Sequence, residues 1–393
     1  MKLIKIISVF ALVILFSCAG KENDPTPMVI SKLNIELEAQ VPIHDKVDIK
    51  LVESTDIGQK IYDGRLERRG GYSMSFPKHS YEVDLKEDVP LGNLPSDDDW
   101  ILNANYIDKT FLRHVFSYEL FEEMDTNNIS SKCQYVEIEL NNVYSGLYVL
   151  MEKLDKSSLK LNGSDSSAFI FKEPHLFTVS YEGIVPQDSS NFHQQTYPKL
   201  EKRNMGSHLE NLRTFILSSS DEIFKSEFSN LFDLRNIIDW HLLLLVSNNN
   251  DGILKNFYLY KSNNETPIRV APWDYDHSFG RDGDNELNMD ERFLNINRSI
   301  LFNRLLGCDW YTKALKDRWQ QLNNSAVLSE RGLKQRVVRM SESINHAAEK
   351  NFELWSVGNA IYYDDNDFEQ EVNIMIKYIE KRHKRLLKYF EDI

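Results

Sequence analysis

The stretch 248–281 constrains this chain most strongly, because it combines two short expected strands with oxygen-bearing side chains at their ends. An aromatic strand follows Asn256, a turn lies around 263–266, and a second strand covers 268–271. The side chains concerned are Asp251, Asn256, Asp274 and Asp276. Two strands joined by a tight turn form a hairpin, so we expect these side chains to meet at one end of it.

Oxygen ligands grouped in this way suit phosphoryl transfer. That reaction needs a carboxylate to orient or deprotonate the attacking hydroxyl, and a divalent cation to offset the charge on the phosphate. Protein kinases place a base Asp and a metal-binding Asn five residues apart, and a metal-binding Asp beyond a hairpin. Asp251 and Asn256 repeat that spacing, and Asp274 or Asp276, followed by Phe279-Gly280, would be the second part. The alternative is that Asp251-Gly252 is only a turn and that the two later carboxylates cap a strand.

The first residues have the pattern of an export signal. Lys2 and Lys5 precede an apolar run over 6–16 that is too short to span a membrane. The run ends Leu15-Phe16-Ser17-Cys18, which is similar to a bacterial lipobox. We therefore expect 1–17 to be a signal peptide, Cys18 to be the lipidated first residue, and 18–33 to be a tether. The alternative is an ordinary signal sequence in which the Cys is incidental.

Composition narrows the choice of partners and the fold class. The formal net charge is −14, which fits nucleic acid poorly because such binding relies on basic patches. Cys133 and Cys308 remain beside Cys18, too few for a disulfide framework. Alternating strands are expected early in the chain and helical periodicity later. We therefore expect an α+β fold, with a β-rich N-terminal lobe at 34–200 and a mainly helical C-terminal lobe at 201–393, which would contain the catalytic hairpin 248–281.

The N-terminal lobe offers candidate contacts for a phosphate. A loop rich in Gly and Ser precedes an alternating strand and could cradle phosphate with its backbone N–H groups. The candidates in and around this loop are Arg69, Gly70, Ser73 and Lys78. Lys78 would act as a point charge, unless the loop is a simple hairpin turn and the Lys is solvated. Glu152 ends a later strand, where a nucleotide-binding protein could place a hinge or a strand could simply meet solvent.

The sequence resembles the CotH kinase family over roughly 35–390. Five blocks in order carry the resemblance: Arg69-Gly70 with Pro77-Lys78-His79-Ser80-Tyr81; Trp100 with Asp108-Lys109-Thr110 and Arg113; Asn142 to Tyr148 with Glu152-Lys153; Asp251 to Tyr260; and Pro272-Trp273-Asp274-Tyr275-Asp276 with Phe279-Gly280. The chain departs from the family pattern where His79 replaces a second Lys and where Gly71-Tyr72 interrupts the Arg-Gly-x-Ser loop.

The resemblance implies an atypical protein-kinase-like fold, ATP as cosubstrate and a divalent metal, Mg²⁺ or Mn²⁺. It implies that Asp251 is the catalytic carboxylate and that Asn256 and Asp274 bind the metal, with Asp276 as a competitor for that role. Arg69, Gly70, Ser73, Lys78 and Glu152 would contact the nucleotide, which would lie between the lobes.

Two functions are consistent with these observations. The first is an exported, membrane-anchored lipoprotein in the periplasm or at the cell surface that transfers the γ-phosphate of ATP to Ser or Thr hydroxyls of a protein. The second is a catalytically inactive surface lipoprotein that uses the same fold to bind a protein or a glycan. Neither function involves nucleic acid.

Overall fold

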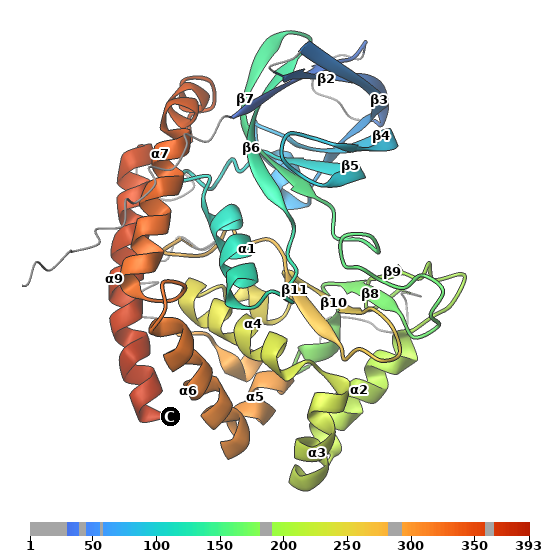
Figure 1. Ribbon diagram of the computed structural model, residues 1–393, viewed down its shortest axis with the longest axis vertical. Coiled ribbons are helices and arrows are strands. Elements are labelled where there is room, and N and C mark those ends of the chain that lie inside the picture. The colour runs from blue at the N-terminus through green and yellow to red at the C-terminus, as the bar shows by residue number, and fades with distance from the viewer. Residues whose placement is uncertain (1–29, 39–44, 56–57, 181–190, 282–292, 358–364) are drawn as a thin grey trace, which may run out of the picture.

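The computed structural model describes residues 30–38, 45–55, 58–180, 191–281, 293–357 and 365–393 (Figure 1). The expected signal peptide, Cys18 and most of the tether lie outside the described residues. In the part of the chain that the structure describes, no helix has the length and apolar character needed to cross a membrane.

The N-terminal part is a closed seven-stranded barrel, more regular than the set of short strands that the sequence predicts (Figure 1). Its strands, in barrel order, are β1 (Ser31–Glu36), β2 (Val47–Thr55), β3 (Gly58–Arg69), β4 (Ser80–Pro90), β5 (Ser96–Asn103), β7 (Val143–Glu152) and β6 (Cys133–Leu140). Leu33 and Ile35 alternate inward along β1, as a half-buried strand requires. Parallel pairing of β1 with β6 closes the barrel and removes its edges.

A second sheet lies below the barrel in Figure 1 and contains the expected hairpin. Its strands are β11 (Arg269–Pro272), β10 (Phe257–Lys261), β8 (Phe169–Lys172) and β9 (Gln195–Tyr197), in that order. β10 and β11 pair antiparallel, with Phe257 opposite Pro272, so the hairpin prediction is confirmed. β8 and β9 lie before residue 200 yet pair into this sheet. This sheet thus joins strands from both sides of residue 200, and the lobe boundary at 200/201 stays a prediction.

Helices make up most of the rest of the chain. They are α1 (Arg113–Met124), α2 (Gly206–Ser218), α3 (Asp221–Leu231), α4 (Leu234–Ser247), α5 (Ile300–Leu306), α6 (Asp309–Asn323), α7 (Glu330–Leu354) and α9 (Phe368–Asp392). Barrel, second sheet and helices together give the α+β class that the sequence predicts.

Helix α4 is the buried centre of the helical part. Asp233 caps its N-terminus by accepting a hydrogen bond of 3.1 Å from the backbone N–H of Asn236. Its C-terminus ends at Asn248, which adopts the left-handed conformation with φ of 55°. Arg382 of α9 donates to the Leu245 carbonyl at 2.7 Å and to Asn248 Oδ1 at 3.0 Å. The loop that follows α4 is therefore fixed from both sides.

The long helices α7 and α9 run along one side of the molecule, and α7 reaches the barrel (Figure 1). Asn351 Oδ1 accepts a hydrogen bond of 3.1 Å from the N–H of Leu147 on β7. The indole N–H of Trp355 donates to the Ser145 carbonyl at 2.7 Å. These contacts set the position of the barrel relative to the helices.

Candidate functional site

A cavity of about 880 Å³ lies where the barrel, α1 and the 248–281 stretch meet. Its lining contains eight of the nine residues that the sequence assigns to catalysis, metal or nucleotide: Arg69, Gly70, Ser73, Lys78, Asp251, Asn256, Asp274 and Asp276. The fold thus brings together residues that are up to 207 positions apart in the chain (276 − 69). It does not by itself assign their roles.

Glu152 is the member of the predicted set that lies outside the described lining of this cavity. It ends β7, and its carboxylate accepts a hydrogen bond of 3.2 Å from the backbone N–H of Lys132. The neighbouring Ser131 hydroxyl donates to the Glu152 carbonyl at 2.7 Å. Burial raises the pKa of Glu152, against the smaller effect of the Lys132 N–H. These hydrogen bonds join the end of β7 to the segment before β6, and the contact of Glu152 with a nucleotide stays a prediction.

Asn256 immediately precedes β10, and Asp274 follows two residues after the end of β11. Both residues therefore lie at the open end of the hairpin. Both have positive φ, of 60° and 57°, a conformation that Asn and Asp adopt more readily than most residues. The N–H of Trp273 donates to the Asn256 carbonyl, and Asn256 Nδ2 donates to the Asp274 carbonyl, each at 2.9 Å. These bonds fix the turn of the backbone that directs the Asp274 carboxylate into the cavity.

Asp251 lies in a single turn of 3-10 helix, Asp251–Ile253, immediately after the loop that ends α4. Its carboxylate faces the same cavity and forms an ion pair with Lys255, the Nζ to Oδ2 distance being 3.0 Å. The side chains are 38% and 54% exposed, so solvent screens the attraction and the pair is weak. Asp251 can consequently exchange Lys255 for another hydrogen-bonding partner at little cost.

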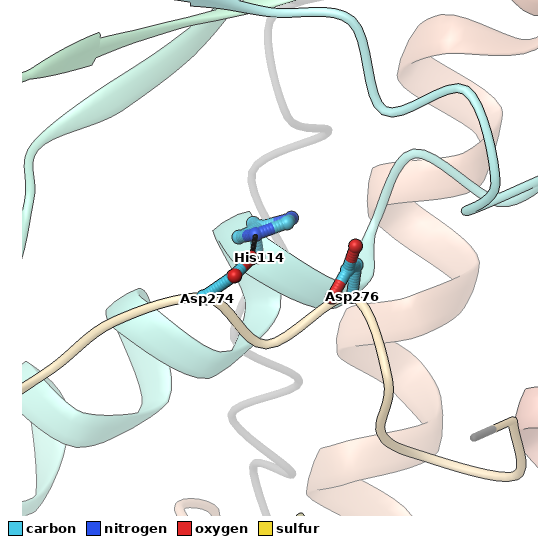
Figure 2. A group of neighbouring side chains, drawn as sticks. All are labelled: His114, Asp274 and Asp276. Atoms are coloured by element: carbon cyan, nitrogen blue, oxygen red, sulfur yellow. Dashed lines mark hydrogen bonds and ion pairs between the residues drawn. The ribbon is translucent and has the colours of Figure 1, made fainter. Parts of the chain in front are cut away.

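His114, Asp274 and Asp276 form a cluster in the cavity (Figure 2). His114 projects from the first turn of α1 toward the segment after β11, and its Nε2 lies 3.2 Å from Asp274 Oδ1. One ligand atom from each of the three side chains lies within 4.8 Å of the others. The His114 side chain is 3% exposed, whereas that of Asp274 is 49% exposed and opens onto the cavity.

The charges in this cluster influence one another strongly. Burial lowers the pKa of His114, but the hydrogen bond to Asp274 and the nearby carboxylate charges outweigh it, so the pKa is raised. Burial raises the pKa of Asp274, but His114 reverses the effect and the pKa is lowered. Asp276 has a raised pKa, because burial and then the charge of Asp274 disfavour its ionised form. The charge of Asp274 thus disfavours the ionised form of Asp276, while the two carboxylates favour the charged form of His114.

The residues present fit a divalent cation. Asp276 Oδ1 is buried and has no hydrogen-bond donor among the described residues, which is an unfavourable state for a carboxylate oxygen. Two carboxylates and an imidazole within one small volume are a common set of metal ligands. Asn256 Oδ1 could add a further oxygen, since the Nδ2 of that side chain is already used.

Basic side chains also line the cavity. Lys78 is 1% exposed, and its Nζ donates to the carbonyls of Leu147 and of Ala104, the latter at 2.9 Å. Burial lowers the pKa of Lys78 well below its usual value. Arg69 and Lys172 lie 5.9 Å and 5.8 Å from the centre of the Trp273 ring, so each makes a cation–π contact next to Asp274.

Sequence reasoning missed His114. It follows Arg113, whose ion pair with Asp108 at the start of α1 is the more conspicuous feature. Arg113 also donates to the Ser278 carbonyl at 2.8 Å, which holds the segment after Asp276 against α1. The available signal was a His among the apolar helical positions from Phe111 to Phe116. Nothing local shows that this position faces residues 160 places later in the chain (274 − 114).

Comparison with known proteins gives a family and a curated relative. The family model described as CotH kinase protein matches residues 66–386. The inner spore coat protein H of Bacillus subtilis (strain 168) is 24% identical over 335 residues, which cover 84% of this chain and 88% of that protein.

Two solved structures show weak likenesses. A chain of the HipA–HipB–operator DNA complex of the Shewanella oneidensis MR-1 toxin–antitoxin system has a TM-score of 0.32 at 13% identity, over 77% of this chain and 61% of that chain. The Helicobacter pylori proinflammatory kinase CtkA has a TM-score of 0.27 at 8% identity, over 79% and 94% of the two chains. TM-scores this low do not establish a common fold.

Proposed function

This chain belongs to the CotH kinase protein family, and we propose that it transfers the γ-phosphate of ATP to Ser or Thr hydroxyls of an exported protein. The observation that carries the proposal is that Asp251 and Asp274 line one cavity, together with the basic side chains Lys78 and Arg69. Phosphoryl transfer needs both kinds of charge at one place, because the reaction depends mainly on positioning and electrostatic stabilisation.

Asp251 would orient or deprotonate the attacking hydroxyl. Its exposed carboxylate can leave Lys255 and accept a hydrogen bond from a Ser or Thr side chain that enters the cavity. Asp274, Asp276 and Asn256 would hold the metal, Mg²⁺ or Mn²⁺. When bound, the cation offsets the charge of the phosphate oxygens.

Lys78 would contact a phosphate in the same cavity. A charged Lys has three N–H donors, and two of those on Lys78 are already used by backbone carbonyls. An approaching phosphate raises the pKa of the amine and favours the charged form, which can then donate its third hydrogen. Arg69, Gly70 and Ser73 lie beside it in the lining and would bind the remaining phosphates.

We further propose that the protein is exported through its 1–17 signal peptide and anchored by lipid on Cys18. The basis is the apolar run that ends in Leu15-Phe16-Ser17-Cys18. The protein would then act in the periplasm or at the cell surface, where its substrate would also be found.

The first test separates binding from transfer in the full-length protein purified in detergent. Asp274→Ala should abolish metal-dependent ATP binding, measured by calorimetry, because the metal loses a charged ligand. Asp251→Ala should keep that binding but lower the rate of phosphoryl transfer about 10²–10⁴-fold, as expected for a proton-accepting group. Asp317→Ala is the control, because this carboxylate is 61% exposed on α6.

The outcomes distinguish the two functions. Exchanged phenotypes would mean that the roles of Asp251 and Asp274 are reversed. If the wild-type protein neither binds ATP with metal nor transfers phosphate, the kinase proposal fails and a protein- or glycan-binding module replaces it.

A further inference from the structure

His114 is placed as a metal ligand rather than as an ordinary core residue. It lies in the first turn of α1, and only its Nε2 edge points to the two carboxylates (Figure 2). Its other nitrogen, Nδ1, lies 3.4 Å from Nδ2 of Asn105, which is itself 5% exposed and lines the same cavity. Both ring nitrogens therefore have defined neighbours.

The state of Asn105 indicates which nitrogen can bind a cation. In the observed orientation of the amide, Asn105 Nδ2 donates to His114 Nδ1, so the imidazole proton is on Nε2 and points to Asp274. In this arrangement Asn105 Oδ1 is buried without a hydrogen-bond donor among the described residues. If the Asn105 amide makes a half-turn, Oδ1 accepts the proton of Nδ1 instead. Nε2 then has a lone pair directed at the cluster, the arrangement that ligating histidines use.

The spacing of the cluster fits a single ion. Ligand atoms at about 2.1–2.3 Å from a metal are roughly 3 Å apart when adjacent and about 4.5 Å apart when opposite. The separation of His114 Nε2 and Asp274 Oδ1 is 3.2 Å, and all three ligand atoms lie within 4.8 Å. A carboxylate oxygen of Asp276 completes the set, and the Oδ1 of this residue is buried without a described donor.

We infer that His114 is a third ligand of the cation that Asp274 and Asp276 hold, and that its nitrogen makes the site prefer first-row transition ions over Mg²⁺. Mg²⁺ favours oxygen ligands and retains several waters, whereas an imidazole nitrogen suits transition ions. The inference rests on the proposed function for the cation site itself. The nitrogen ligand narrows the expected metal from Mg²⁺ or Mn²⁺ to Mn²⁺ or a later divalent ion of the first transition row.

The test uses Mn²⁺ as a probe of the full-length protein in detergent, without nucleotide. Pulsed electron paramagnetic resonance should show ¹⁴N coupling to the bound Mn²⁺ in the wild-type protein. Labelling the histidines with ¹⁵N should replace the ¹⁴N coupling by ¹⁵N coupling. This measurement identifies histidine as the ligand without any mutation. The coupling should disappear in His114→Asn, and the Mn²⁺ to Mg²⁺ affinity ratio from competition should fall at least about tenfold.

His277→Asn is the matched control. His277 lines the same cavity, but its Nε2 is 3.9 Å from Asp276 Oδ1 and it lies outside the three-residue cluster. Its variant should retain the nitrogen coupling. His114→Gln serves as a second variant, and thermal melting confirms that each variant is folded. The assignment is overturned if the nitrogen coupling persists in both His114 variants, or if it disappears in His277→Asn.

The results also separate this inference from the function on which it rests. Mn²⁺ binding without nitrogen coupling in the wild-type protein rejects His114 as a ligand and leaves the kinase proposal intact. Absence of Mn²⁺ binding to the wild-type protein, or Mn²⁺ binding that is unchanged in Asp274→Ala, rejects both the role of His114 and the proposed cation site. An unchanged affinity ratio in His114→Gln would show that the side chain only orients Asp274 through its hydrogen bond.

Discussion

Two buried histidines in this protein have pKa values shifted in opposite directions by their surroundings. His114 is buried beside two carboxylates, and its pKa is raised. His241 is also fully buried, in α4, but its neighbours are the Tyr311 hydroxyl at 3.0 Å and the Phe302 ring. Burial lowers the pKa of His241 to about 3, so it is neutral in the folded protein. The same residue type thus has opposite consequences for stability in acid.

His241 gives a prediction for the pH dependence of stability. An unfolded His has a pKa of about 6.5, so below that pH the unfolded chain takes up a proton that the folded chain excludes. The stability associated with His241 is therefore fully present above pH about 6.5 and is lost as the pH falls toward 3. Between pH 7.5 and 5.5 the loss should be about 1.4 kcal/mol.

His241→Asn removes the titrating group, so its melting temperature should fall less between pH 7.5 and 5.5 than that of the wild type. The difference should be about 1–3 °C in thermal scans, although the variant is less stable at both pH values. His346→Asn, at an exposed position on α7, should behave like the wild type. Parallel curves for wild type and His241→Asn would contradict the prediction.

Helices and strands that depend on residues near in sequence could be predicted. The closure of the barrel, which depends on strands far apart in sequence, could not. Asp233 caps α4 through Asn236, three residues away, and the two strands of the hairpin are adjacent in sequence. These features are set by short-range chemistry that a sequence displays. The barrel closes when Ser31 pairs with Val136, a contact that no local pattern specifies.

The residues of the candidate site also fall into two groups, those with a local sequence signal and those that only tertiary packing brings to the cavity. Asp251 and Asn256 have a recognisable spacing within one stretch, and Asp274 follows at the end of the same hairpin. His114 joins them because α1 packs against α4, and Lys78 because the segment just before β4 brings it into the cavity lining. That Glu152 lies outside the described lining could not be predicted, because the end of a strand looks the same in sequence whether it faces a cavity or a neighbouring segment.

Arg382 provides a prediction about how α9 supports α4. Its hydrogen bonds to the Leu245 carbonyl and to Asn248 Oδ1 satisfy buried acceptors at the start of the loop that contains Asp251. Arg382→Met should lower the free energy of unfolding by about 2–4 kcal/mol, because each unsatisfied buried acceptor costs about 1–3 kcal/mol. Amide hydrogen exchange should also become faster over 248–256.

Lys384→Met is the control for Arg382→Met. Lys384 lies on the same helix, but it is 64% exposed and pairs with Glu380 at 2.8 Å, so its loss should cost less than about 0.5 kcal/mol. If both variants unfold at the same urea concentration, or exchange over 248–256 does not change, α9 does not support the loop.

For the whole molecule, the proposed anchor leads to a prediction about location. Cys18→Ala should release the protein from the membrane fraction into the soluble extract, because the proposed lipid would be attached to this side chain. Cys133→Ala should remain with the membranes, since Cys133 lies on β6 of the barrel. The two fractions can be compared by immunoblotting, and membrane attachment that survives Cys18→Ala would rule out the lipid anchor.

The contacts of α9 also determine the order in which the molecule can be assembled. Tyr378 and Arg382 bind the carbonyls of Val246 and Leu245, so the last helix supports a loop made some 130 residues earlier (378 − 246 = 132). A chain emerging from the ribosome or crossing a translocation channel still lacks this support when Asp251 appears. If the protein is exported as proposed, the loop that contains Asp251 gains the support of α9 only after this last helix has also crossed the membrane.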